Sequence, residues 1–208
     1  MKPVRISQVA THLFLLVSLL VVALWSAICP HDYFIWFLET LPALVAIVLL
    51  LITYKRFQLS LLLYVLIWLH CIVLFVGGHY TYELVPLFDN LRDFFGHARN
   101  NYDKLGHFAQ GFVPAIAARE LLIRTSTLKR GKWMVALILL GVLGISAAYE
   151  IIEWFSALAL GDGSDAFLGT QGDIWDAQSD MLCAFIGATS ALLLLSKAHD
   201  RSLKKQGV

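Results

Sequence analysis

The amino-acid sequence predicts an all-α, polytopic membrane protein, built as a bundle of six transmembrane helices with two longer outer loops. Apolar residues make up 59% of the 208 residues and charged residues only 15%, against about 25% in a typical soluble domain. The mean hydropathy is +0.72, and the apolar residues gather in runs of about 20, the length of a helix that crosses the hydrocarbon core. These observations exclude a disordered chain and argue against a soluble globular one.

Six segments have the length and apolar content of membrane-spanning helices, and they form a single membrane domain over residues 1–208. In chain order, the predicted spans are 12–29, 34–54, 57–77, 105–123, 133–154 and 178–197. We expect helices rather than barrel strands, because lipid does not tolerate open sheet edges and the short β-branched stretches do not alternate as barrel strands do.

The first three spans are strongly apolar. The span 12–29 follows basic residues, but its apolar run exceeds that of a signal peptide and no small-residue cleavage site follows, so we expect an uncleaved anchor. The second span carries Glu39 and Pro42, and the third carries His70. Because ionisable groups are costly inside a membrane helix, Glu39 and His70 are secondary candidates for substrate binding, or for a structural pair with each other.

The last three spans carry more polar sequence. The fourth has the lowest hydropathy of the six and is the weakest predicted span. Its polar side chains are His107, Gln110, Arg119 and Glu120. The fifth span ends in Glu150 and Glu153, and the sixth opens with Asp180.

The distribution of charge predicts the orientation in the membrane. When the N-terminus is placed in the cytoplasm, 12 of the 16 Lys and Arg residues fall on the inner side. Of the 15 acidic residues, only Glu120 and Asp200 fall on that side. By the positive-inside rule, both termini are predicted to be cytoplasmic. With no organelle signal and a short six-helix layout, we expect a multi-pass protein of the bacterial inner (cytoplasmic) membrane.

Two connections are longer than the others, and both are predicted on the outer side. They cover residues 78–103 and 157–177 and are rich in charged residues and glycine. Loops of this length without secondary structure are often functional. No linker or sequence repeat divides the chain.

Ionisable side chains of the last three spans gather at one depth near the outer surface. Asp103 and His107 are four residues apart and share a helix face, and two acids of the fifth span are three apart. Three acids before and within the sixth span follow the same helical period, and small residues below them let that face pack into the bundle. The metal-site candidates are therefore Asp103, His107, Glu150, Glu153, Asp173, Asp176 and Asp180.

The chemistry of this set is limited. Carboxylates with one imidazole form an oxygen-rich ligand set typical of Mg, Mn or Ca, and with the imidazole also of zinc or iron, so a divalent metal is the candidate cofactor. The same groups could perform acid–base chemistry or relay protons. In a catalytic version, His107 is a ligand or base. Glu150 and Asp180 are then ligands or acid–base partners, and Lys104 steadies an anionic substrate headgroup.

Each candidate also has a purely structural interpretation. Asp103 could cap a helix, and Lys104 could reach the membrane surface along its alkyl stem. The acids before the sixth span could serve only as favourable charges at a helix start. His107 could be a core histidine with satisfied hydrogen bonds, and Glu153 could face water.

Three segments resemble known family patterns: Tyr102–Phe108, Tyr149–Trp154 and Gly172–Gly187. They are similar to the YjdF-type family of uncharacterised bacterial inner-membrane proteins. More distantly, the second half of the chain, about 102–191, resembles the VanZ-like family, which is linked to resistance to the glycopeptide teicoplanin. Neither resemblance implies an established reaction.

The likeness to the VanZ-like family rests on a DK-x-x-HF helix start and a run of spaced acids. The first element is matched by Asp103, Lys104, His107 and Phe108, and the start of the second by Asp173 and Asp176. Asp180 stands where that family has Asn, and Glu153 where its members tend to carry Gln. These two departures add carboxylates, so the resemblance does not carry a ligand over to this chain.

Together, these observations predict an inner-membrane protein whose site of His and carboxylates faces outward and binds a divalent metal or a lipid or envelope-precursor headgroup. Whether the site is catalytic stays open. The alternatives are a proton-coupled transporter and a structural or assembly protein. The lipid bilayer is the predicted partner. Nucleic acid is excluded, because 16 basic and 15 acidic residues give a net charge of only +1. The sequence predicts no oligomeric state.

Overall fold

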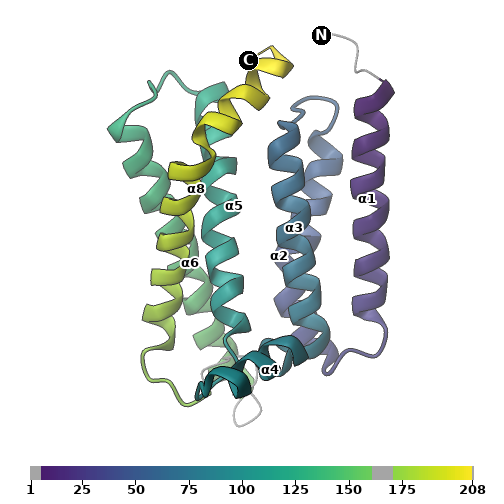
Figure 1. Ribbon diagram of the computed structural model, residues 1–208, viewed down its shortest axis with the longest axis vertical. Helices are drawn as coiled ribbons and strands as arrows, with labels where there is room; N and C mark the ends of the chain where they lie inside the picture. The colour runs from purple at the N-terminus through teal and green to yellow at the C-terminus, as the bar shows by residue number, and fades with distance from the viewer. Residues whose placement is uncertain (1–5, 161–170, 208) are drawn as a thin grey trace.

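The structure, a computed structural model, describes residues 6–160 and 171–207, and within them all regular structure is helical. The helices are α1 (Ile6–Ala27), α2 (Tyr33–Thr53), α3 (Leu61–Tyr80), η1 (Tyr82–Leu84), α4 (Pro86–Phe95), α5 (Tyr102–Thr125), α6 (Lys132–Leu160) and α8 (Asp176–Gln206). Figure 1 shows the long helices side by side, with the short α4 across one end. The all-α bundle is therefore confirmed. We call that end the α4 end, and the opposite end, where α1 begins and α8 ends, the terminal end.

Five of the described helices are long and apolar enough to cross a membrane: α1, α2, α3, α6 and α8. The helix α5 is not among them, in keeping with the low hydropathy of residues 105–123. It nevertheless runs alongside the others and packs against α3, α6 and α8 (Figure 1). Its polar side chains therefore face neighbouring helices rather than lipid, which removes the cost of exposing them to hydrocarbon.

Several helix ends differ from the predicted spans. The third helix begins at Leu61 rather than residue 57, because the Ser60 side chain accepts a hydrogen bond from the main-chain N–H of Leu63 and caps the helix. The last helix continues well beyond residue 197, to Gln206. Its extension is amphipathic and buries His199 and Leu203, so hydropathy alone does not detect it.

The segment 78–103, predicted as a loop, contains the helix α4. Pro86 begins this helix and Gly96, with φ +67°, ends it in the left-handed conformation that glycine adopts without strain. The apolar side chains of Leu87, Leu91 and Phe94 lie on one face and are exposed. A short helix with an exposed apolar face across the end of the bundle fits the boundary between lipid and water. Of the second predicted loop, 157–177, residues 161–170 lie outside the described part.

Small residues hold α5 and α8 close together. A Cβ atom on Gly111 would overlap the main chain of Ala184, and one on Gly187 would overlap the main chain of Phe108. The predicted small-residue face of the last helix is therefore confirmed, since Ala184, like Ala188, is fully buried. This close approach brings the polar first turns of both helices together at the α4 end.

A buried polar network lies near the terminal end. Arg119 Nη1 donates to His199 Nδ1 at 2.8 Å, so His199 carries its proton on Nε2 and donates it to Glu120 at 2.9 Å. Glu120 also accepts from the Ser60 N–H at 2.8 Å and from Arg124 at 2.9 Å. Glu120 and His199 are fully buried and their hydrogen bonds are satisfied, so this network locks α5 to α8 and to the start of α3.

Candidate functional site

The first turns of α5 form the centre of the candidate site. Asp103 and His107 lie on one face of α5, with Asp103 Oδ1 3.4 Å from His107 Nε2, and both are buried. Asp103 is not a helix cap, because the helix starts after Asn101 and the Asp103 carboxylate faces His107 and Arg99. The structural interpretation of Asp103 as a cap is therefore wrong.

The helix α8 contributes a second carboxylate to the same place. Asp180 is only 2% exposed and lies one turn before Ala184, whose main chain lies against Gly111 of α5. One potential ligand atom from each of Asp103, His107 and Asp180 lies within 4.8 Å of the other two. Three of the predicted site residues are thus assembled from two helices.

The helix α6 supplies Glu150 from the opposite side. Its Oε1 lies 3.7 Å from His107 Nε2 and has no hydrogen-bond partner, although it is buried. Glu153 lies one turn further along α6. No hydrogen bond or ion pair joins it to another described residue, so the structure does not bring it into direct contact with the other candidates.

Lys104 joins α5 to α8 instead of reaching the membrane surface. Its Nζ lies 2.6 Å from Asp176, 2.9 Å from Asp180 and 2.6 Å from the Ser179 hydroxyl. Three acceptors of the protein therefore occupy the three donors of the ammonium group. In this arrangement, Lys104 has no free donor with which to hold the substrate headgroup that the sequence predicts for it.

Arg99 is a member of the site that the sequence interpretation missed. Its guanidinium group contacts Asp176, and lies 3.6 Å from Asp103 and 3.7 Å from Asp173. Arg99 lies before α5, which begins at Tyr102, so helical spacing gave no signal for this contact. Asp173 also accepts a hydrogen bond from the main-chain N–H of Trp175 at 2.9 Å, which shows a local structural role.

A second missed feature ties the start of α5 to the segment before α8. The main-chain N–H of Asn100 donates to Gln171 Oε1, and Gln171 Nε2 donates to the Asn100 carbonyl, both at 2.9 Å. The Asn100 side chain is fully buried and donates to the carbonyl of Val85 at 3.1 Å. Neither residue belongs to a motif, so no sequence signal indicated this contact.

The charges of this cluster do not balance. Five carboxylates and two permanent cations, Arg99 and Lys104, lie within ion-pair distance of one another or of His107. The carboxylates are Asp103, Glu150, Asp173, Asp176 and Asp180. Even a protonated His107 leaves an excess of negative charge. Buried charge without a counter-charge is costly, so the arrangement favours binding of protons or of a metal cation.

The predicted pair of Glu39 and His70 does not form. Glu39 Oε2 and His70 Nε2 are both buried, and each lacks a hydrogen-bond partner. The position of a residue along a helix gives its depth in the membrane, but it does not fix the direction in which the side chain points. The prediction of a structural pair is therefore wrong, while binding of substrate by either residue stays untested.

A cavity of about 320 Å³ lies next to the cluster on the side of the terminal end, between α2, α3, α5 and α6. His107 forms part of its wall together with His70, Gln110, Tyr82 and Tyr149. Tyr82 lies in η1, and burial raises its pKa well above the usual value, so the phenol stays neutral.

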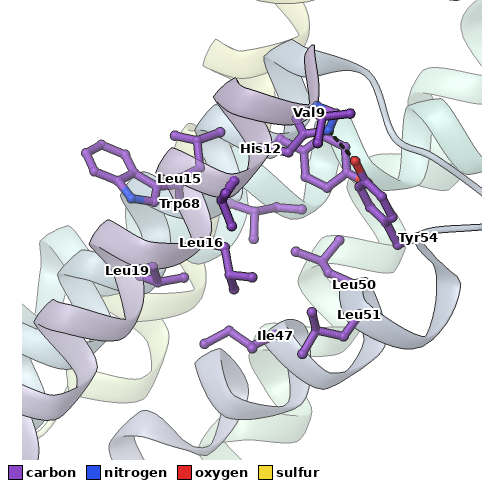
Figure 2. A pocket seen from close by; sticks show the side chains of 13 residues that line it. Val9, His12, Leu15, Leu16, Leu19, Ile47, Leu50, Leu51, Tyr54 and Trp68 are labelled. Carbon is purple, nitrogen blue, oxygen red and sulfur yellow. Dashed lines mark hydrogen bonds between the residues drawn. The ribbon is translucent and has the colours of Figure 1, made fainter. Parts of the chain in front are cut away.

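A second cavity, of about 260 Å³, lies among α1, α2 and α3, and Figure 2 shows its lining. Apolar side chains, leucines above all, line most of it. The polar groups at its edge satisfy each other, since His12 Nδ1 lies 2.9 Å from the Tyr54 hydroxyl. No carboxylate lines this cavity, so it does not extend the site.

Comparisons with known proteins identify relatives of the chain. The sequence model of the family described as "Predicted membrane protein (DUF2238)" matches residues 11–201, which include every candidate site residue. The chain is 47% identical over 191 residues to the inner membrane protein YjdF of Escherichia coli (strain K12), which covers 92% of this chain and 91% of that protein. No solved structure matches.

Proposed function

The chain belongs to the DUF2238 family of predicted membrane proteins, and from that premise we propose that it binds a divalent cation between α5, α6 and α8. It is a multi-pass protein of the inner membrane, in keeping with its apolar helices and with the name of its relative YjdF. The cation site would lie at the α4 end of the bundle and face the periplasm.

One observation carries the proposal: Asp103, His107 and Asp180 present ligand atoms within 4.8 Å of one another. All three side chains are buried, so a cation bound there would be shielded from water. Glu150 Oε1, buried and without a hydrogen bond, lies close enough to His107 to supply a fourth ligand. Carboxylate oxygens with a single imidazole suit Mg²⁺ or Mn²⁺, and also Zn²⁺ or Fe²⁺.

The remaining acids have a different role in this proposal. Asp176 is already engaged by Arg99 and Lys104, and Asp173 lies in the same group of ion pairs. These pairs hold α5 against α8 and thereby keep Asp103 and Asp180 at ligand distance. We therefore restrict the ligand set to Asp103, His107, Glu150 and Asp180, with Asp173 and Asp176 as supporting charges. Glu153 is left outside the set.

The described side chains of α5 argue against the transporter alternative. Between His107 and Arg119, the only side chain of α5 with a hydrogen-bonding group is Gln110. At the terminal end, Arg119 and Glu120 are fully engaged in the buried network with His199. A proton or ion that left the site through the cavity between α2, α3, α5 and α6 would meet apolar side chains such as Ile67 and Ala117 before it reached the terminal end.

A role in catalysis on an envelope substrate remains a hypothesis built on the cation site. The resemblance of residues 102–191 to the VanZ-like family stays a prediction from the sequence, and we propose no reaction from it. In a catalytic version, His107, Glu150 and Asp180 are the candidates that would touch the substrate or the cation. The geometry favours the binding of a cation over any particular reaction.

The experiment that tests the proposal is elemental analysis of the detergent-purified protein, with wild type beside His107→Ala. His97→Ala is the matched control, because His97 is exposed and lies near the same end of the bundle. We expect about one divalent metal per chain in wild type and in His97→Ala, and about tenfold less in His107→Ala. The proposal would be contradicted if wild type contained no metal after incubation with Mg²⁺, Mn²⁺ and Zn²⁺ in turn. Equal metal contents in wild type, His107→Ala and His97→Ala would also contradict it.

A further inference from the structure

The cavity next to the cluster runs from the candidate site toward the middle of the bundle. The end of the cavity nearest the candidate site is formed by His107, Tyr82 and Tyr149. The end nearest the middle of the bundle is formed by Ala46 and Ala117. Along α5 it reaches from Gly106 to Ala117, which corresponds to about 16 Å of helix. Its volume of about 320 Å³ is that of a ligand pocket rather than a packing defect.

The wall of this cavity changes from polar to apolar with depth. His107 Nδ1, the side-chain amide of Gln110 and His70 Nε2 are buried and have no hydrogen-bond partner. Pro114, which also lines the cavity, lacks the N–H that would bond the carbonyl of Gln110 within the helix. Further toward the terminal end, the wall consists of apolar side chains such as Ile67. Buried polar groups are nearly always hydrogen-bonded. The wall therefore fits an occupant with polar groups near the candidate site and an apolar part toward the middle of the bundle.

The cavity opens sideways toward the bilayer. Pro42 on α2 and Ile145 on α6 both line it, and both are exposed, Ile145 by 53%. The helix α2 packs against α3, and α6 packs against α5 and α8, but α2 and α6 make no extensive contact with each other. The exposed side chains of a membrane-spanning helix face lipid, so the opening between α2 and α6 faces the hydrocarbon chains of the membrane.

We propose that this cavity holds the hydrocarbon chain of a membrane lipid whose phosphate group binds the cation at Asp103, His107 and Asp180. The inference rests on the proposed cation site, because the excess of carboxylates would otherwise repel a phosphate. Hard divalent cations are commonly held by a few carboxylates together with the phosphate oxygens of a substrate. The ester or hydroxyl groups that follow the phosphate then lie at the level of Gln110 and His70.

The test is native mass spectrometry of the detergent-purified protein, titrated with oleoyl lysophosphatidic acid. Monoolein has the same chain without the phosphate and is the matched probe. Ala46→Phe and Ala117→Phe fill the cavity from two different helices. Val45→Phe is the control, because Val45 is 48% exposed on the outside of α2. Each protein is measured with Mn²⁺ and with a chelator, after thermal unfolding has shown that it is folded.

We expect wild type and Val45→Phe to bind one lysophosphatidic acid when Mn²⁺ is present, and about tenfold more weakly with the chelator. Either cavity-filling variant that folds should also bind about tenfold more weakly. The inference is overturned if wild type binds no lysophosphatidic acid, if folded filling variants bind it normally, or if monoolein binds equally well.

The metal content of the same samples separates this inference from the proposed function. The cavity-filling variants keep all four proposed ligands and should retain their metal. Wild type that contains metal but binds no lipid refutes only the lipid site. Wild type that contains no metal refutes the cation site itself.

Discussion

Gly111 on α5 lies directly against the main chain of Ala184 on α8, with no space for a side chain between them. This contact sets the separation of the two helices one turn below the candidate ligands His107 and Asp180. The position of the ligands therefore depends on a residue that has no chemistry of its own.

We predict that Gly111→Leu destabilises the protein by about 2 kcal/mol or more, because the obstacle is main chain, which cannot move aside as a side chain can. The same change should lower metal content by separating Asp103 from Asp180. Thermal unfolding in detergent and elemental analysis measure the two effects. Gly141→Ala on α6 is the control, because open space surrounds that position, and it should be neutral or slightly stabilising. Normal stability of Gly111→Leu would refute the close packing.

Lys104→Met should destabilise the protein by about 2–3 kcal/mol, because it leaves Asp176 and Asp180 with less compensating charge in a largely buried place. Adding Asp180→Asn should restore part of the stability, since it removes one of the unpaired charges. Thermal unfolding of the single and double variants tests this coupling. Lys132→Met, at an exposed position, serves as the control. Additive losses in the double variant would show that the pair is not coupled.

Glu120→Gln should destabilise the protein by about 2–3 kcal/mol without changing its metal content. The carboxylate accepts hydrogen bonds from Ser60, Arg124 and His199 at the same time, and a neutral amide cannot accept all of them. Chemical or thermal unfolding gives the stability, and elemental analysis gives the metal content. Loss of metal at unchanged stability would contradict a purely structural role for the terminal end.

The orientation of the chain can be tested with single cysteines in a background without the three native ones. Asp93→Cys on α4 should react with a membrane-impermeant maleimide in intact spheroplasts. Lys204→Cys near the end of α8 should react only after the membrane is permeabilised, because basic residues gather on the cytoplasmic side. The reverse labelling pattern would place the candidate site in the cytoplasm.

The sequence predicts the long helices well because their apolar runs are long and continuous. It also predicts the contact between Asp103 and His107, since both lie on one helix and helical spacing fixes which side chains meet. The helix α4 was missed although Pro86 and Gly96 stand at its ends in the expected order. Its short length and mixed composition concealed it within a polar segment.

Contacts between helices were harder to predict. Helical periodicity places a side chain at a depth, but the rotation of each helix against its neighbours depends on packing of the whole bundle. For this reason, the sequence left open a structural pair of Glu39 and His70 that does not form. The contact between Asn100 and Gln171 joins segments 71 residues apart without a recognisable motif, so it becomes visible only in the structure.

The position of the candidate site near the α4 end has an electrical consequence. A charge that crosses a membrane gains or loses about 2.3 kcal/mol for each 100 mV of membrane potential. Because His107 lies in the second turn of α5, a cation that entered from the α4 end would cross only a small part of this field before it reached the site. Occupancy of the site would then follow the cation concentration on one side of the membrane and depend little on the membrane potential.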